Sequence, residues 1–144
     1  IEVKKNKKQY LDLLLLADEQ ENMIDRYLDK GKMYVLDDNG IKCECIVTDE
    51  GNDVLEIKNI ATVPDYQGKG YAKSLIDFIV EKYREQYAIL QVGTGDSPLT
   101  IPFYEKCGFV RSHIIPNFFT DNYDHPIYED GVQLVDMVYL QRQL

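Results

Sequence analysis

The chain has no tryptophan, only two histidines and only three cysteines in its 144 residues. The cysteines, Cys43, Cys45 and Cys107, form an odd and non-repeating set, which argues against a disulfide framework and for a reducing, cytoplasmic compartment. Cys43 and Cys45 alternate on a strand-like run and share one face, so we expect buried thiols. His113 and His125 add no zinc-site spacing to these cysteines, and we expect no metal.

Basic residues are also scarce, because 16 lysines and arginines stand against 25 acidic residues and give a net charge of −9. Nucleic-acid binding needs clustered basic side chains, so this balance argues against a nucleic-acid partner. It suits a cationic small molecule or a basic peptide, or a charge that serves solubility alone. No apolar run approaches the ~18 residues of a membrane-spanning helix. We therefore expect one domain over residues 1–144 and no membrane partner.

Hydrophobic periodicity and turn residues predict a mixed order of helices and strands. The expected helices cover residues 8–30 (one or two helices), 73–86 and 99–106. The expected strands cover residues 33–36, 41–48, 54–63, 87–92, 109–115 and 132–140, and 116–131 is expected to be a loop or hairpin. The strand–helix–strand crossover around residues 73–86 should be parallel and right-handed. The fold class is therefore α+β (α/β), with a mixed, mostly antiparallel sheet, a central parallel strand pair and helices on both faces.

The segment Gln67-Gly68-Lys69-Gly70-Tyr71-Ala72 lies between a strand-like run and a helix-like run. The first turn of a helix leaves backbone N–H groups without intrahelical partners, and the helix dipole adds partial positive charge there. Glycine lets such a backbone approach an anion closely, because it has no Cβ. The segment therefore predicts a phosphate-binding turn, with an ordinary tight turn as the alternative. A dinucleotide fingerprint is not met, because Lys73 stands where its third glycine belongs.

A second segment, Phe103-Tyr104-Glu105-Lys106-Cys107-Gly108-Phe109, follows downstream. The first segment resembles the Q/R-x-x-G-x-G/A motif of the GNAT superfamily of acetyl-CoA-dependent N-acetyltransferases, and the second resembles its F-Y-x-x-x-G-F signature. Element order and length agree over essentially the whole chain. The resemblance implies transfer of an acetyl group from acetyl-CoA to a primary amine in a ternary complex, and homodimers are common among similar proteins. The alternative is a non-catalytic acyl-CoA-binding or regulatory module on the same fold.

The resemblance also implies a donor site. The backbone N–H groups from Gly68 through Lys69, Gly70 and Tyr71 to Ala72 would bind the CoA pyrophosphate, with Gln67 shaping the loop. The strand end Ile60-Ala61-Thr62-Val63 would line the pantetheine and hydrogen-bond it like an added strand. In the family this strand splays from the next one, residues 89–92 here, and the cofactor enters the gap. Ser97 stands where the family often has a cofactor-contacting asparagine, and we interpret it as a helix N-cap with Pro98 at the first helical position.

Three residues are candidates for the chemistry that the resemblance implies. Tyr104 would also contact the cofactor and would protonate the departing thiolate, a nearly balanced transfer because a thiol titrates near ~8.5 and a phenol near ~10. The Ile60 N–H would polarise the acetyl carbonyl. Glu56 lies where some family members carry a catalytic glutamate and would remove the amine proton, which costs roughly 4–5 kcal/mol at pH 7. The alternatives are an ion pair of Glu56 with Lys58 and a water chain as the base.

Residues 116–131 combine five aromatic-type rings with four carboxylates. That composition suits a cationic, partly apolar acceptor, and it also suits a surface hairpin that packs against a dimer partner. By resemblance only, the acidic stretch 18–21 would form the other wall of the acceptor site. The segment Gly93-Thr94-Gly95-Asp96-Ser97 lacks the Gly-Lys-Ser/Thr ending of a nucleotide loop. We interpret its glycines as giving close passage past the cofactor.

Overall fold

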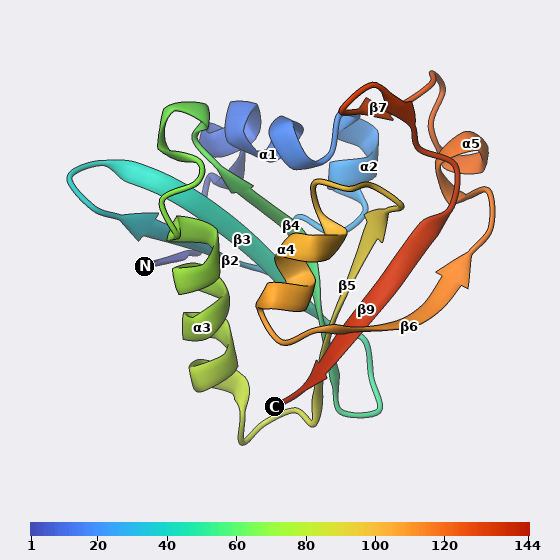
Figure 1. Ribbon diagram of the computed structural model, residues 1–144. Coiled ribbons are helices and arrows are strands. Elements are labelled where there is room, and N and C mark those ends of the chain that lie inside the picture. Colours follow the sequence, from blue (N-terminus) through green and yellow to red (C-terminus); the bar gives the residue numbers. More distant parts are fainter.

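A seven-stranded sheet in the order β1-β2-β3-β4-β5-β9-β6 organises the computed structural model, which describes residues 1–144 (Figure 1). Its strands are β1 (Glu2–Val3), β2 (Lys32–Asp37), β3 (Ile41–Asp49), β4 (Val54–Thr62), β5 (Ile89–Gly95), β6 (Val110–Ile115) and β9 (Met137–Gln143). Only the central pair β4–β5 is parallel, and all other neighbours are antiparallel. The predicted mixed, mostly antiparallel sheet is confirmed.

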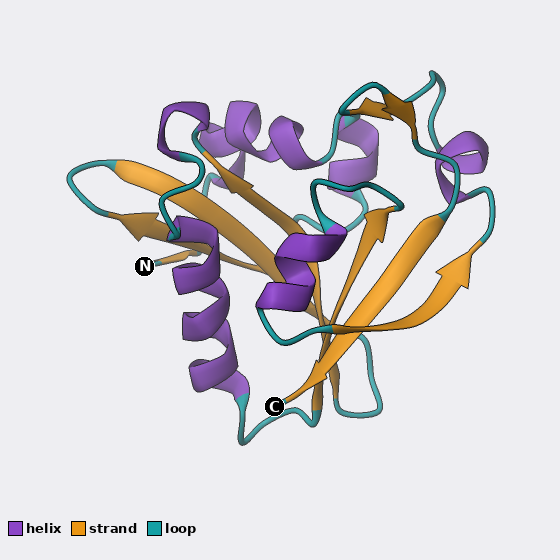
Figure 2. Cartoon of the chain, in the orientation of Figure 1, coloured by secondary structure: helices purple, strands orange, loops and turns teal.

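Helices cover both faces of this sheet (Figure 2). They are η1 (Lys7–Tyr10), α1 (Leu11–Ala17), α2 (Glu21–Asp25), η2 (Pro64–Tyr66), α3 (Tyr71–Tyr83), α4 (Ile101–Lys106) and α5 (Phe118–Asn122). Side chains alternate along β2, so that Met33 and Val35 pack with α1 and α2 while Tyr34 packs with α3 on the other face. The two cores therefore share one sheet, as the predicted helices on both faces require. None of the helices is long and apolar enough to cross a membrane.

The cysteines are free and buried. Cys43 and Cys45 belong to the same core cluster between the sheet, α3 and α4, together with Cys107. This confirms that the two thiols on β3 share one face. Burial raises the pKa of Cys43 to about 11, so this thiol stays protonated and packs as a small apolar side chain.

The largest difference from the predicted elements lies in the last quarter of the chain. The predicted strand 132–140 is wrong in its first part, because Val132–Gln133 forms β8, which pairs with β7 (Tyr128–Glu129), and β9 starts only at Met137. Residues 116–131, predicted to be a loop or hairpin, also contain the helix α5. Phe119, Ile127 and Leu134 form a small core of their own beneath this excursion. That cluster joins residues far apart in sequence, so local periodicity does not reveal it.

Candidate active site

The parallel strands β4 and β5 stay paired only over their first halves. Their register runs from Val54 opposite Ile89 to Ile57 opposite Val92. Beyond that point β5 continues on β9 to Gly95, and β4 continues on β3 with an irregularity in the ladder. The two strands therefore diverge, as Figure 1 shows. The splay that the resemblance implied is present in the structure.

The backbone of β4 presents unpaired polar groups to this gap. The Val63 N–H donates to the Lys42 carbonyl at 2.9 Å, and hydrogen-bonded and non-bonded pairs alternate along an antiparallel ladder. Thr62 and Ile60 therefore occupy non-bonded positions of the β3–β4 ladder. Their N–H and C=O groups point away from β3 and toward β5. In agreement, the Thr62 carbonyl accepts a hydrogen bond from the Gln67 side chain at 3.3 Å instead of from β3.

A cavity of about 670 Å³ occupies the gap and extends to the start of α3. Most of the predicted donor-site residues line it: Ile60, Ala61, Thr62, Gln67, Gly68, Gly70, Tyr71, Ala72 and Tyr104. Val63, Lys69 and Ser97 are not among its lining residues. The sequence motifs thus converge on one cavity, although they lie about forty residues apart.

One end of the cavity suits an anion. Gly68 and Gly70 have φ values of 78° and 87°, a left-handed conformation that glycine adopts without steric cost. The first intrahelical bond of α3 runs from the Ser74 N–H to the Gly70 carbonyl, and no side chain caps the helix. Its leading N–H groups are therefore free to bind a ligand. Lys73 and Lys106 line the same cavity and add positive charge, so these residues fit a phosphate-bearing molecule.

Tyr104 lies deeper in the cavity, on α4. Its ring packs edge-to-face against Phe103 and Phe109, with centroid distances of 5.1 and 5.7 Å. Burial raises the pKa of the Tyr104 hydroxyl above its ordinary value. The hydroxyl therefore stays protonated at neutral pH and can donate. The sequence predicts a nearly balanced proton transfer from Tyr104 to the thiolate. Burial makes this transfer less favourable, because the buried phenol holds its proton more tightly.

Glu56 occupies a different environment from Tyr104. Its buried carboxylate lies 2.7 Å from Lys58 Nζ, and it accepts hydrogen bonds from Gln91 Nε2 at 2.6 Å and from the Tyr139 hydroxyl at 3.4 Å. It lies where β4 and β5 are still paired, and it does not line the cavity. Of the two alternatives for this residue, the ion pair with Lys58 is present. The role of Glu56 as the base stays a prediction, and its carboxylate has no direct access to the cavity.

The two segments suggested as acceptor walls do meet. Asp18, which follows α1, accepts hydrogen bonds from the Tyr27 hydroxyl at 3.0 Å and from the Tyr123 hydroxyl at 2.6 Å. The Asp124 N–H donates to the Gln20 side chain at 3.1 Å. Burial raises the pKa of Asp18, and both tyrosine hydroxyls oppose that shift. The contact fixes residues 116–131 against the turn between α1 and α2, beside the diverging strands.

Of the two expectations about residues 93–98, the one about the glycines is wrong and the one about Ser97 holds in part. A Cβ on Gly93 would lie 2.6 Å from Met137 Sδ, and one on Gly95 would lie 2.6 Å from the Leu134 methyl groups. The space that a side chain would fill at these glycines is therefore occupied by Met137 and Leu134, and not by the cofactor. The structure assigns α4 from Ile101, but Ser97 makes the hydrogen bonds of an N-cap: its hydroxyl accepts the Leu99 N–H at 3.1 Å and its carbonyl accepts the Ile101 N–H at 3.3 Å.

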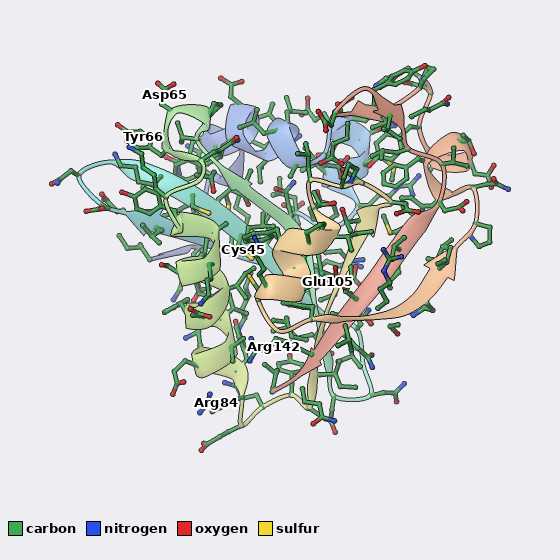
Figure 3. The ribbon with its side chains drawn as sticks, viewed as in Figure 1. Cys45, Asp65, Tyr66, Arg84, Glu105 and Arg142 are labelled. Atoms are coloured by element: carbon green, nitrogen blue, oxygen red, sulfur yellow. The ribbon has the colours of Figure 1, made fainter.

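Several lining residues escaped the sequence-based prediction. Tyr66 is the last residue of η2 (Figure 3), with Lys42 Nζ 3.9 Å from its ring centroid, and it lines the cavity. Phe103 and Lys106 lie inside the second motif, which could have indicated them. Glu129 reaches the cavity from β7. No local signal points to Glu129, because its position depends on how residues 116–131 fold.

Comparison with known proteins decides the family. A model described as an acetyltransferase (GNAT) domain matches residues 29–111. An uncharacterised N-acetyltransferase of Bacillus subtilis, YvbK, is 35% identical over 136 residues, which is 92% of this chain and 88% of that protein. The chain belongs to the GNAT acetyltransferase family. It is an N-acetyltransferase by this relationship, and the family resemblance carried by the two motifs is confirmed.

Solved GNAT structures share the whole fold. A GNAT acetyltransferase from Elizabethkingia anophelis, solved with acetyl-CoA bound, has a TM-score of 0.93 and 34% identity and covers 100% of this chain and 96% of its own. A Bacillus subtilis acetyltransferase in complex with CoA has a TM-score of 0.90 and 32% identity, and the match covers 100% of this chain and 97% of that protein. An IAA acetyltransferase from Bacillus cereus has a TM-score of 0.91 and 32% identity, and the match covers 100% of this chain and 99% of that protein.

Proposed function

We propose that this GNAT protein transfers the acetyl group of acetyl-CoA to the primary amine of a cationic acceptor by direct attack in a ternary complex. The observation that carries the proposal is the single cavity that joins the glycine turn, Ile60 and Tyr104. Two similar structures were solved with CoA or acetyl-CoA bound, which supports the same donor here. The non-catalytic alternative has less support, because the polar side chain of Glu129 lines the same cavity as Tyr104.

The donor would lie between the diverging strands. The free N–H groups between Gly68 and Ala72 would hold the pyrophosphate, since a helix N-terminus combines unpaired donors with a favourable dipole. Lys73 and Lys106 would contribute further positive charge. The outward-facing N–H and C=O groups of Ile60 and Thr62 would pair with the pantetheine amides, as an added strand pairs with a sheet edge.

At the reacting end the protein would supply two donors. The amine nitrogen attacks the thioester carbonyl, so that a C–N bond forms and the C–S bond breaks. The Ile60 N–H would donate to the carbonyl oxygen as it gains negative charge. Tyr104 would donate its proton to the sulfur that leaves, and would regain a proton through solvent from the nitrogen that becomes an amide. Glu56 is already held by three donors. A water chain is therefore a simpler route for the amine proton than transfer to Glu56.

Release of CoA across a panel of primary amines tests this proposal. With Tyr104→Phe we expect a fall in kcat of roughly 10²-fold or more, the range of general acid catalysis, at an unchanged dissociation constant for acetyl-CoA. Tyr87→Phe is the control, because Tyr87 lies far from the cavity and bonds Asp49 through its hydroxyl at 3.1 Å. If the wild type turns over no amine, or if Tyr104→Phe is as fast as the wild type, the proposed mechanism is wrong.

A further inference from the structure

Glu129 is the only carboxylate among the residues that line the cavity. It lies on β7, on the opposite side of α4 from the start of α3 (Figure 1). The two lysines of the cavity, Lys73 and Lys106, belong to α3 and to the last turn of α4. Lys73 also pairs with Asp77 at 3.0 Å. The cavity therefore carries basic side chains on its α3 and α4 walls and one carboxylate on its β7 wall. The cavity can therefore hold a phosphate-bearing donor near its basic walls and the ammonium group of an acceptor near Glu129.

Glu129 has no cationic partner in the structure. It takes part in none of the ion pairs of the molecule, whereas Glu56 is paired with Lys58. Asp18 is engaged by two tyrosine hydroxyls. Glu129 therefore keeps acceptor capacity for a ligand at the reacting end of the cavity.

The charged and titratable surroundings of Glu129 favour a proton acceptor. Half-burial raises its pKa, the Ser97 hydroxyl opposes this, and the negative charges of Glu19 and Asp130 raise it further. Tyr104, on α4, lines the same cavity, and the charge of Glu129 contributes to the raised pKa of Tyr104. A carboxylate with a raised pKa is a stronger base than an ordinary surface glutamate.

We propose that Glu129 binds the ammonium group of the acceptor and takes its proton before the attack. The step is balanced: the ammonium N–H bond breaks, the proton moves to a Glu129 carboxylate oxygen, and the neutral amine keeps its electron pair for the carbonyl carbon. Glu129 then releases the proton to solvent. This role rests on the proposed acetyl transfer and gives it a base other than Glu56. Leu16 and Leu99, which line the same cavity, suit an acceptor whose amine is carried on an apolar chain.

The test compares Glu129→Gln with Glu105→Gln, a matched change at an exposed residue of α4 that does not line the cavity (Figure 3). For Glu129→Gln we expect kcat/KM for the best amine of the panel to fall roughly 10²-fold or more at pH 7. The loss should shrink about tenfold for each pH unit until it has vanished, since below its pKa the amine becomes about tenfold more neutral in solution with each unit. A merely structural role would not give that recovery.

Binding of acetyl-CoA separates this inference from the proposed function. Glu129→Gln should bind acetyl-CoA within about twofold of the wild type in calorimetry, which also shows that the variant is folded. An active wild type with an equally active Glu129→Gln overturns the role of Glu129 and leaves acetyl transfer intact. A pH-independent loss overturns the role as base. A wild type that binds acetyl-CoA and acetylates no amine overturns both proposals.

Discussion

Replacing Gly70 by alanine is expected to weaken acetyl-CoA binding far more than the same change at Gly51. Gly70 has a φ of 87° and Gly51 a φ of 82°, and no atom lies within 4 Å of a Cβ built on either. The backbone strain should therefore be equal, about 1–2 kcal/mol in the free energy of unfolding for each variant. Only the Gly70 methyl group would enter the cavity, because Gly70 lines it and Gly51 does not.

The dissociation constant for acetyl-CoA separates these two effects. For Gly70→Ala we expect it to rise tenfold or more, which corresponds to about 1.4 kcal/mol, because the new Cβ would hold the pyrophosphate away from the N–H groups of α3. For Gly51→Ala we expect no change in that constant. Urea unfolding of the free proteins measures the strain, and calorimetry measures the affinity. Equal affinities for the two variants would refute a pyrophosphate site at Gly70.

Three further changes test other parts of the structure. Burial raises the pKa of Glu44 well above its ordinary value, and the Ala61 backbone opposes this only in part. The folded protein therefore keeps a proton that the unfolded chain releases above about pH 4.3, and stability falls as pH rises, by up to about 1.4 kcal/mol per unit. Glu44→Gln should remove this fall, so that its gain over the wild type in urea unfolding grows from pH 5 to pH 8. Lys58→Met should cost about 1–3 kcal/mol in the same assay, because Glu56 keeps only its two neutral donors. Gly95→Ala should cost about 1–3 kcal/mol through its clash with Leu134, with the KM for acetyl-CoA unchanged.

The parts of the site that were predictable are those written in consecutive residues. The turn around Gly68 and Gly70 combines a strand end, left-handed glycines and a helix start, all within ten residues. Tyr104 sits inside a motif that ends at Phe109, directly after the glycine that follows α4. In both places local backbone chemistry dictates the structure, so the sequence carries the information directly.

The remaining features depend on contacts between distant segments. The partners of Glu56 include Gln91 and Tyr139, which come from two other strands. Gly93 and Gly95 are explained only by Met137 and Leu134, about forty residues later. No periodicity encodes such pairings, so the sequence alone does not show that side chains from β9 and the segment before it occupy the space beside these glycines.

The position of Glu129 also depends on distant contacts. Residues 116–131 fold over their own small core and are fixed to Asp18 by Tyr123. This arrangement brings a carboxylate from β7 into a cavity whose other walls come from α3, α4 and β4. The composition of the segment predicted acidic and aromatic character near the acceptor, but it did not single out one residue.

A crystal structure of the protein with acetyl-CoA tests the central claim most directly. We expect the pyrophosphate on the N–H groups between Gly68 and Ala72, and the thioester carbonyl about 3 Å from the Ile60 nitrogen, within hydrogen-bond distance. The sulfur should lie beside the Tyr104 hydroxyl, with the open side of the thioester toward Glu129. Acetyl-CoA bound outside the gap between β4 and β5, or with its thioester turned away from Ile60 and Tyr104, would contradict the account.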